Sequence, residues 1–121
     1  MRIRMGATIE GNRIARWRHE AASFSHVGRP APGRPGIDLL AAGEIDPGFP
    51  SNPPEPRLGP EVGIHRNALP LYEFAQTQVV KRFVPASPLR TSALRGLGAQ
   101  GNVFAIESFI DELALLAGRD P

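Results

Sequence analysis

A proline- and glycine-rich stretch in the middle of the chain, residues 28–70, restricts the fold more than any other feature. It holds ten of the 13 prolines and seven of the 13 glycines of the 121-residue chain. Proline cannot donate to a helix or a central strand, and glycine weakens both elements. Regular structure is therefore expected before and after this stretch. Within it, only Ile37 to Ala42 is predicted to form a short helical turn.

This central stretch has two interpretations. A structureless segment of this length is uncommon inside a compact domain. It is either a linker or a loop that wraps over a surface that this chain does not contain. Its apolar residues favour the wrapping loop, because true linkers contain fewer such residues; they are Phe49, Leu58, Val62 and Leu69.

Residues 2–20 have the pattern of a β-hairpin. Apolar and polar side chains alternate along residues 2–9, which is the period of a half-buried strand. Gly11-Asn12 can form a tight turn, and the alternation resumes over residues 13–19 around Trp17. An isolated hairpin is only marginally stable in water, so we expect another element to cover its apolar face.

The chain after the central stretch is predicted to contain a strand and a helix. Residues 76–84 are rich in β-branched and aromatic side chains and are followed by Pro85. Residues 102–118 have helical periodicity, with Asn102 as the expected N-cap and Gly118 as the expected C′ residue. The apolar stripe of this helix is wide, which predicts burial on more than one side; it consists of Val103, Ile106, Phe109, Ile110, Leu113, Leu116 and Ala117.

A glycine loop, residues 88–101, connects these two elements. Its Gly-x-Gly-x-x-Gly pattern and Arg95 can be read as an anion site at the start of a helix. A dinucleotide fingerprint also needs a strand directly before the glycines and an acidic residue about 20 positions later. Here Pro88, four residues of mixed character and Arg95 stand before the glycines, and the chain stops at Pro121, so we reject that fingerprint. On physical grounds alone, glycines that merely close a turn are the favoured interpretation.

Composition excludes several other classes of protein. The formal net charge of +2 is too small to indicate nucleic-acid binding, and the absence of cysteine excludes disulfides and thiolate chemistry. No apolar run approaches the ~20 residues of a membrane span, and no apolar segment of a signal peptide follows Met1. The histidines lack the spacing of metal ligands and are expected at the surface or in hydrogen bonds. Tyr72 is expected to be a packed aromatic residue with a satisfied hydroxyl.

The last third of the chain resembles a known family. Its motifs are Leu94-Arg95-Gly96-Leu97-Gly98, a helix with Glu107-x-x-x-Asp111-Glu112-Leu113-Ala114, and Gly118-Arg119-Asp120-Pro121. They resemble the molybdopterin-binding (large or beta) subunit of the xanthine dehydrogenase/aldehyde oxidase family, including isoquinoline 1-oxidoreductase-like members. The upstream segments Ile14–Glu20 and Arg66–Tyr72 are similar to that family as well.

The resemblance implies an α+β fold and a fragment of a larger molybdopterin-binding domain, of which residues 1–121 are one part. It implies a molybdenum hydroxylase that oxidises an aldehyde or an N-heterocycle with a water-derived oxygen. The cofactor is a molybdenum–molybdopterin, expected as a dinucleotide and only in the complete subunit. The implied partners are the rest of the large subunit, an iron–sulfur subunit, and a flavin or cytochrome electron acceptor. The compartment, bacterial cytoplasm or periplasm, is left open.

The same resemblance assigns roles to five residues. Arg95, Gly96 and Gly98 match cofactor-binding positions of the glycine loop. Leu97 matches an aromatic position that lines the substrate channel in xanthine-type members, and leucine cannot stack on a purine. Arg66 matches a substrate-binding arginine. The family's glutamate base lies outside this stretch, so no catalytic residue and no metal ligand is assigned, and we expect the isolated chain to be inactive.

Two alternatives remain open from sequence. The chain can be a small module that binds anions or nucleic acid through Arg95 and the hairpin arginines Arg2, Arg4, Arg13, Arg16 and Arg18. It can also be a structural domain or a truncated remnant without chemistry. The near-neutral charge and the lack of interleaved aromatic residues argue against the first alternative. A small core and a long uncovered loop argue against an independently stable domain.

Overall fold

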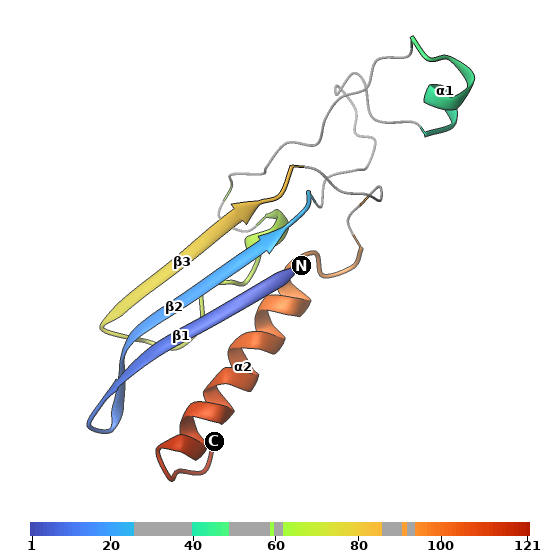
Figure 1. Cartoon of the computed structure of the whole chain (residues 1–121). Coiled ribbons are helices and arrows are strands. Elements are labelled where there is room, and N and C mark those ends of the chain that lie inside the picture. The colour runs from blue at the N-terminus through green and yellow to red at the C-terminus, as the bar shows by residue number, and fades with distance from the viewer. Residues whose placement is uncertain (26–39, 49–58, 60–61, 86–90, 92–93) are drawn as a thin grey trace.

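The chain forms a three-stranded sheet with one long helix against it, which confirms the predicted α+β class (Figure 1). The computed structural model describes residues 1–25, 40–48, 59, 62–85, 91 and 94–121. Its elements are β1 (Arg2–Glu10), β2 (Arg13–Ser23), α1 (Leu40–Ile45), the 3₁₀ turn η1 (Gly63–His65), β3 (Gln76–Phe83) and α2 (Ala99–Leu116).

The sheet has the order β1-β2-β3 and combines two kinds of pairing. β1 and β2 form the predicted antiparallel hairpin, closed at Gly11, whose φ of 60° is the positive value that a tight turn requires. β3 lies parallel to β2, with Arg16 opposite Gln76 and Ser23 opposite Phe83. The third strand was predicted from its composition, but its parallel pairing was not.

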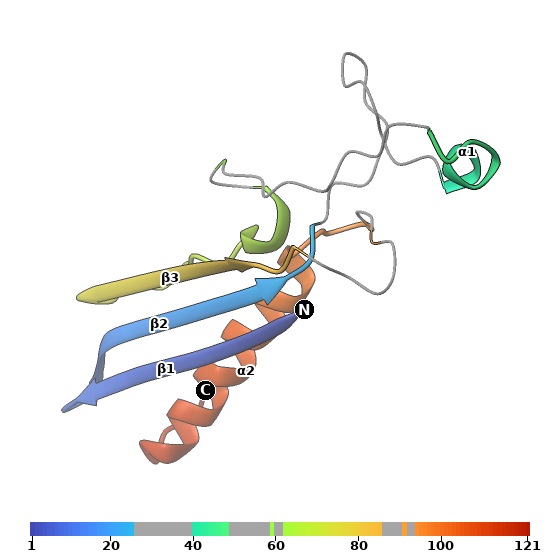
Figure 2. The same ribbon diagram turned by 45° about the horizontal axis from the view of Figure 1, so that its top comes forward.

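The core lies between the sheet and α2, which covers one face of the hairpin (Figure 2). Trp17 of β2 is 2% exposed and packs with Ile106 and Leu113 of α2. Its indole ring stacks on Phe74 with centroids 4.8 Å apart and contacts Phe109 at 5.5 Å. α2 is therefore the element that covers the apolar face of the hairpin.

The start of α2 differs from the prediction, whereas its end agrees. The helix begins at Ala99, directly after Gly98, so Asn102 lies in its first turn and is not the N-cap. The prediction was wrong because the asparagine side chain is used elsewhere, in buried hydrogen bonds described below. Gly118 follows the C-cap with a φ of 67°, as expected for a C′ glycine.

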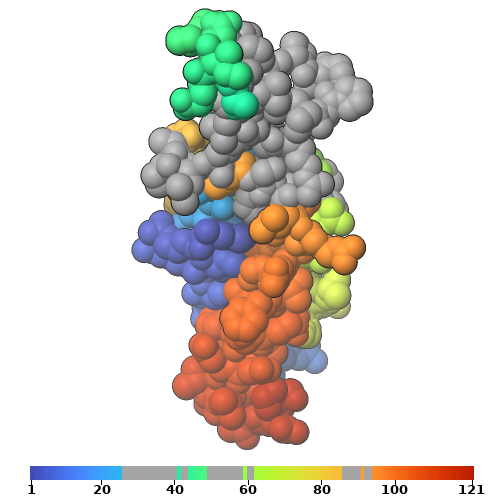
Figure 3. Space-filling model, turned by 90° about the vertical axis from the view of Figure 1, so that its right-hand side faces the viewer, coloured from blue at the N-terminus to red at the C-terminus, as the bar shows by residue number. Residues whose placement is uncertain are grey.

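Part of the predicted apolar stripe faces away from the core. Ile106 and Leu113 are buried, but Val103 and Leu116 are exposed, and so are Phe104 and Leu115 at 74% and 70%. Figure 3 shows this outer side of α2, with β1 along one flank and residues 62–72 along the other. Among the described residues, no part of the chain covers this side.

The central stretch lies mostly outside the described residues. Of the helical turn predicted over Ile37 to Ala42, residues 40–42 belong to α1, which continues to Ile45. Residues 62–70 comprise η1 and the turn that follows it at Arg66 and Asn67, and Ile64 and Ala68 of this segment are buried. This last part of the stretch therefore packs against the sheet and α2 rather than acting as a linker.

Candidate functional site

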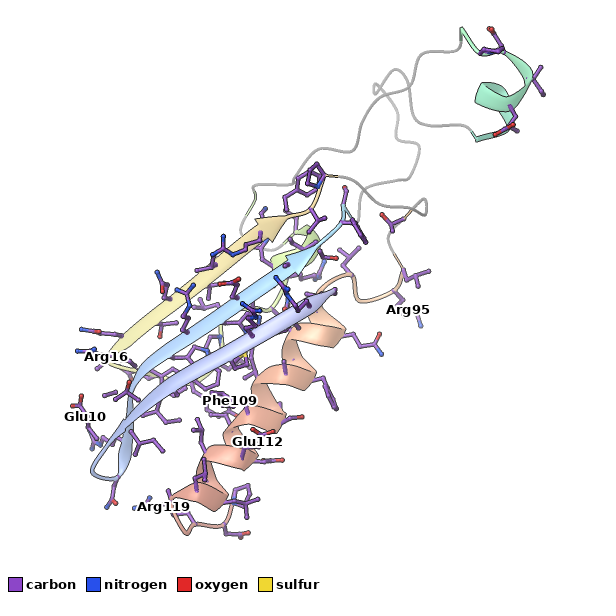
Figure 4. All side chains as sticks on the ribbon, in the orientation of Figure 1. Glu10, Arg16, Arg95, Phe109, Glu112 and Arg119 are labelled. Atoms are coloured by element: carbon purple, nitrogen blue, oxygen red, sulfur yellow. The ribbon has the colours of Figure 1, made fainter. Side chains whose placement is uncertain are left out.

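The glycine loop turns sharply before α2 and exposes Arg95. Gly96 and Leu97 both have positive φ, 86° and 52°, and the Leu97 N–H donates to the Leu94 carbonyl at 3.1 Å. Leucine rarely adopts this conformation, so the loop holds a strained residue next to a permissive one. The Arg95 side chain points away from the sheet at the start of α2 (Figure 4).

The three glycines of the loop pattern have three different structural roles. Gly98 packs directly on η1, because a Cβ there would lie 2.5 Å from the Ile64 carbonyl oxygen. Gly101 lets α2 approach β1, since its Cβ would meet the Met1 sulfur at 3.2 Å. Gly96 supplies the positive φ, and a Cβ there would meet only Gln100, at 3.7 Å. The pattern thus follows from packing and needs no nucleotide.

Backbone donors at the start of α2 are already used inside the fold. The Gly98 N–H donates to the Gly63 carbonyl at 3.2 Å, and the Ala99 N–H donates to Gly96 at 2.9 Å. The anion site expected from unpaired N–H groups therefore loses these donors. Arg95 and the exposed backbone of Gly96 remain as the part of the loop that an external anionic group can reach.

Arg66 lies beside this loop, at the end of η1. It is the C-cap of the 3₁₀ turn and is exposed, while the neighbouring Ile64 is buried. His65 is held in the turn, with its Nε2 2.6 Å from the Gly59 carbonyl oxygen. The structure therefore brings the backbone of Arg66 and the glycine loop to the same end of α2.

A buried polar cluster joins these segments to the sheet. His19 of β2 and Asn102 of α2 are both 0% exposed, and His19 Nε2 lies 3.0 Å from Asn102 Oδ1. Asn102 Nδ2 donates to the carbonyls of Ile64 at 3.0 Å and Arg66 at 2.8 Å. A carbonyl oxygen only accepts, so His19 Nε2 carries the donated proton in its neutral form. Burial lowers the pKa of His19, against a smaller raising effect of the Asn102 hydrogen bond.

This buried cluster of His19 and Asn102 was not predicted from the sequence. The expectation that the histidines are surface or hydrogen-bonded residues holds for His19 and His65, while His26 lies outside the described residues. The available signal was weak: His19 lies on the same strand face as Trp17, and Asn102 lies among apolar helix residues. Their contact joins residues 83 positions apart, so no local pattern indicates it.

The opposite face of the sheet is rich in arginine. The side chains of Arg2, Arg4, Arg16, Arg18 and Arg82 share it by register. The Glu20 carboxylate at its centre binds Arg82 Nε at 2.7 Å and Arg18 Nη2 at 2.9 Å, and Arg18 also donates to Gln78. The hydrogen bond from Arg82 is the largest cause of the lowered pKa of Glu20.

Tyr72 has the satisfied hydroxyl that was predicted. Its O–H donates to the Glu107 Oε2 at 2.6 Å, and its ring lies 6.2 Å from that of Phe74. The carboxylate stabilises the protonated phenol, which raises the pKa of Tyr72. Glu107 is thus engaged on the outside of α2.

The described part of the chain has neither a metal-binding cluster nor a helix that could cross a membrane. Residues 1–25, 40–48, 59, 62–85, 91 and 94–121 contain no group of three or more histidine or carboxylate side chains placed to hold a metal ion. Within the same ranges, no helix has the length and apolar character of a membrane span.

Comparison with known proteins shows a similarity to part of a dehydrogenase. The chain is 38% identical over 93 residues to a subunit of nicotinate dehydrogenase from Pseudomonas putida. The alignment covers 76% of this chain but only 7% of the length of that protein. No protein-family model matches the chain, and no solved structure matches it. The similarity is thus to a small part of a long subunit of a dehydrogenase.

Proposed function

We propose that this chain corresponds to one segment of the molybdopterin-binding subunit of a xanthine dehydrogenase/aldehyde oxidase-type enzyme. The observation that carries the proposal is the 38% identity over 93 residues to the nicotinate dehydrogenase subunit of Pseudomonas putida. The glycine-loop, helix and Gly-x-Asp-Pro motifs point to the same family. In the complete subunit the substrate would be an aldehyde or an N-heterocycle, and the electrons would leave through iron–sulfur and flavin or cytochrome partners.

The residues of the glycine loop fit this role in part. Arg95 is exposed and has no hydrogen-bond or ion-pair partner among the described residues, and Gly96 next to it is exposed as well. A planar guanidinium next to an exposed glycine suits contact with a phosphate or pterin oxygen. Gly98 fits less well, because η1 already fills the space where its side chain would be. We therefore propose Arg95 and Gly96 as cofactor contacts and Gly98 as a packing residue.

In this proposal the chain supplies binding and orientation only. The molybdenum cofactor would supply the oxidation of a C–H bond. Arg95 would bind an anionic part of that cofactor, and the turn at Gly96 would let the backbone approach it. Leu97 and Arg66 are proposed to face the substrate, with Arg66 providing a fixed positive charge for a carboxylate or a polar ring substituent.

The first experiment is the intact mass of the native polypeptide that carries this sequence, measured by immunoprecipitation and mass spectrometry. We expect a mass far above the 13.1 kDa of this chain. That polypeptide is then purified, and its molybdenum is measured by inductively coupled plasma mass spectrometry. Arg95→Ala should lower the molybdenum content several-fold, whereas Arg119→Ala, an exposed arginine at the far end of α2, should not. A full-length polypeptide without molybdenum would contradict the proposal.

The arginine-rich sheet face favours a second candidate function, the binding of a polyanion. Arg2, Arg4 and Arg16 have no ion-pair partner among the described residues. This candidate predicts that the purified chain binds a single-stranded oligonucleotide and that the affinity falls steeply with salt. If the chain does not bind the oligonucleotide at low salt, polyanion binding is excluded as its function.

A further inference from the structure

Asn102 occupies an unusual position for a helix residue. It is completely buried, and both of its amide donors and its carbonyl oxygen have partners on three different segments: β2, η1 and the turn after η1. Asparagine is a poor helix former, and burying its amide costs free energy unless every hydrogen bond is made. An apolar side chain would serve burial alone better. What asparagine adds is a fixed geometry between the groups that it bonds.

The same end of α2 is tied to η1 a second time. Gly98 donates its N–H to the Gly63 carbonyl, and its lack of a side chain lets the two backbones touch. Asn102, one turn later, holds the carbonyls of Ile64 and Arg66. The N-cap and the first turn of α2 therefore bind the carbonyls of Gly63, Ile64 and Arg66. His19 orients the Asn102 amide from the opposite side, because its Nε2–H occupies the Oδ1 atom.

We propose that Asn102 is a positioning residue, which holds the turn carrying Arg66 in a fixed relation to the glycine loop carrying Arg95. The inference rests on the proposed function, which makes Arg95 a cofactor contact and Arg66 a substrate contact. The further point is that the buried amide of Asn102 fixes the positions of both Arg66 and Arg95, so the two loops that carry them are not independent. His19 acts through Asn102 and touches neither ligand.

The test compares two variants of the 121-residue chain by amide hydrogen exchange and NMR. Asn102→Asp removes both donors to η1 but keeps the helix and the size of the side chain. Leu113→Ala, lower on the same helix, removes only apolar core contacts. We expect exchange at the amides of Gly98 and Ala68 to rise at least tenfold more in Asn102→Asp than in Leu113→Ala. The pKa of His19 should rise only in Asn102→Asp, because a carboxylate then faces the imidazole.

A second pair of variants keeps the inference testable if Asn102→Asp does not fold. His19→Gln retains an N–H donor for Asn102 Oδ1 and should preserve the low exchange rates. His19→Leu removes that donor and should raise exchange at Gly98 and Ala68. A uniform rise across the chain in all the destabilised variants would overturn the inference, because Asn102 would then add stability without fixing the two loops.

The link to the proposed site is tested separately in the long native polypeptide. We expect Asn102→Asp to lower molybdenum retention several-fold, as Arg95→Ala does. If Asn102→Asp raises amide exchange in the two loops but leaves molybdenum retention unchanged, the positioning role is wrong and the proposed function still holds. A wild-type polypeptide without molybdenum would instead contradict the proposed function, while the exchange rates would still decide whether Asn102 fixes the two loops.

Discussion

Gly98 shows how a single residue can be conspicuous in a sequence for one reason and needed in the fold for another. Its place in a glycine pattern suggested contact with a ligand, yet the neighbouring backbone of η1 occupies the space beside it. Gly101 lies against the side chains of Met1 and Ile3, and of the three glycines only Gly96 is exposed. A loss of function after substitution of Gly98 would therefore be explained first by impaired folding and not by a lost contact with a ligand.

Gly98→Ala should destabilise the chain strongly. The added methyl group would lie 2.5 Å from a carbonyl oxygen of η1, so the two segments would have to separate. Overpacking of this kind costs about 1–3 kcal/mol. The matched control is Gly6→Ala in β1, where no atom lies within 4 Å of the new methyl group. Urea denaturation of both variants measures the difference, and equal midpoints would show that the contact at Gly98 is not needed.

The buried imidazole of His19 should make stability depend on pH. Its pKa is lowered in the folded chain, so the unfolded chain binds a proton first as pH falls below ~6.5. Stability is then expected to be fully present above that pH and to decline through mildly acidic pH, by at most ~1.4 kcal/mol per pH unit. Urea midpoints at pH 8, 6 and 5 test this, and His19→Gln should flatten the decline.

At the scale of secondary-structure elements, α2 holds the sheet through a small number of residues. Ile106 and Leu113 are buried against Trp17, and one turn of the helix also carries the polar contacts of Asn102. The other sides of the helix contribute little to this contact, because Phe104, Leu115 and Leu116 are exposed. The stability of the whole chain therefore depends on one narrow face of one helix.

Substitutions to alanine along α2 should therefore destabilise the chain at buried positions and have little effect at exposed ones. Leu113→Ala, at a side chain 8% exposed, should cost about 2–4 kcal/mol. Leu115→Ala, two residues later and 70% exposed, should change stability by less than about 0.5 kcal/mol. Thermal unfolding followed by circular dichroism compares the two variants. Similar losses of stability in the two variants would mean that α2 is buried on both sides in solution.

Elements with a local pattern could be predicted from the sequence, and contacts between distant segments could not. The apolar residues of the hairpin and of the C-terminal helix repeat with the period of their structure, the third strand is rich in β-branched residues, and all three elements were predicted. The parallel pairing of β2 with β3 and the contact of His19 with Asn102 leave no such pattern, because the partners are 60 and 83 residues apart. The start of α2 was misplaced because Asn102 suits a cap by its chemistry but is used in the core.

At the scale of the whole molecule, the described surface carries more large apolar residues than a small independent domain needs. One group lies on α2 and the loop before it, and another follows η1; the most exposed members of these two groups are Leu69, Leu71, Leu94, Phe104, Leu115 and Leu116. Exposed apolar patches mark surfaces that another part of a protein covers. This agrees with the proposal that the chain corresponds to a segment of a larger subunit.

The isolated chain should therefore self-associate through the outer side of α2. Replacing Phe104 and Leu115 by serine removes two large exposed apolar side chains of this helix without touching the core. Sedimentation velocity over a range of concentrations should show larger species for the wild-type chain and a shift toward monomer for the double variant. The control is Glu112→Gln, which alters the same helix but not its apolar surface. Association unaffected by the serine variant would place the interface elsewhere.

The parallel pairing of β2 with β3 also has a consequence for the order of folding. Residues 16–23 of β2 each pair with a residue 60 positions later, so β2 cannot complete its ladder until the chain beyond it has been made. At ~5–20 residues per second, a nascent hairpin would wait several seconds on the ribosome with the β2 edge uncovered. An uncovered edge of this kind can pair with other chains. The hairpin is thus most vulnerable to aggregation after it has emerged from the ribosome and before β3 and α2 follow.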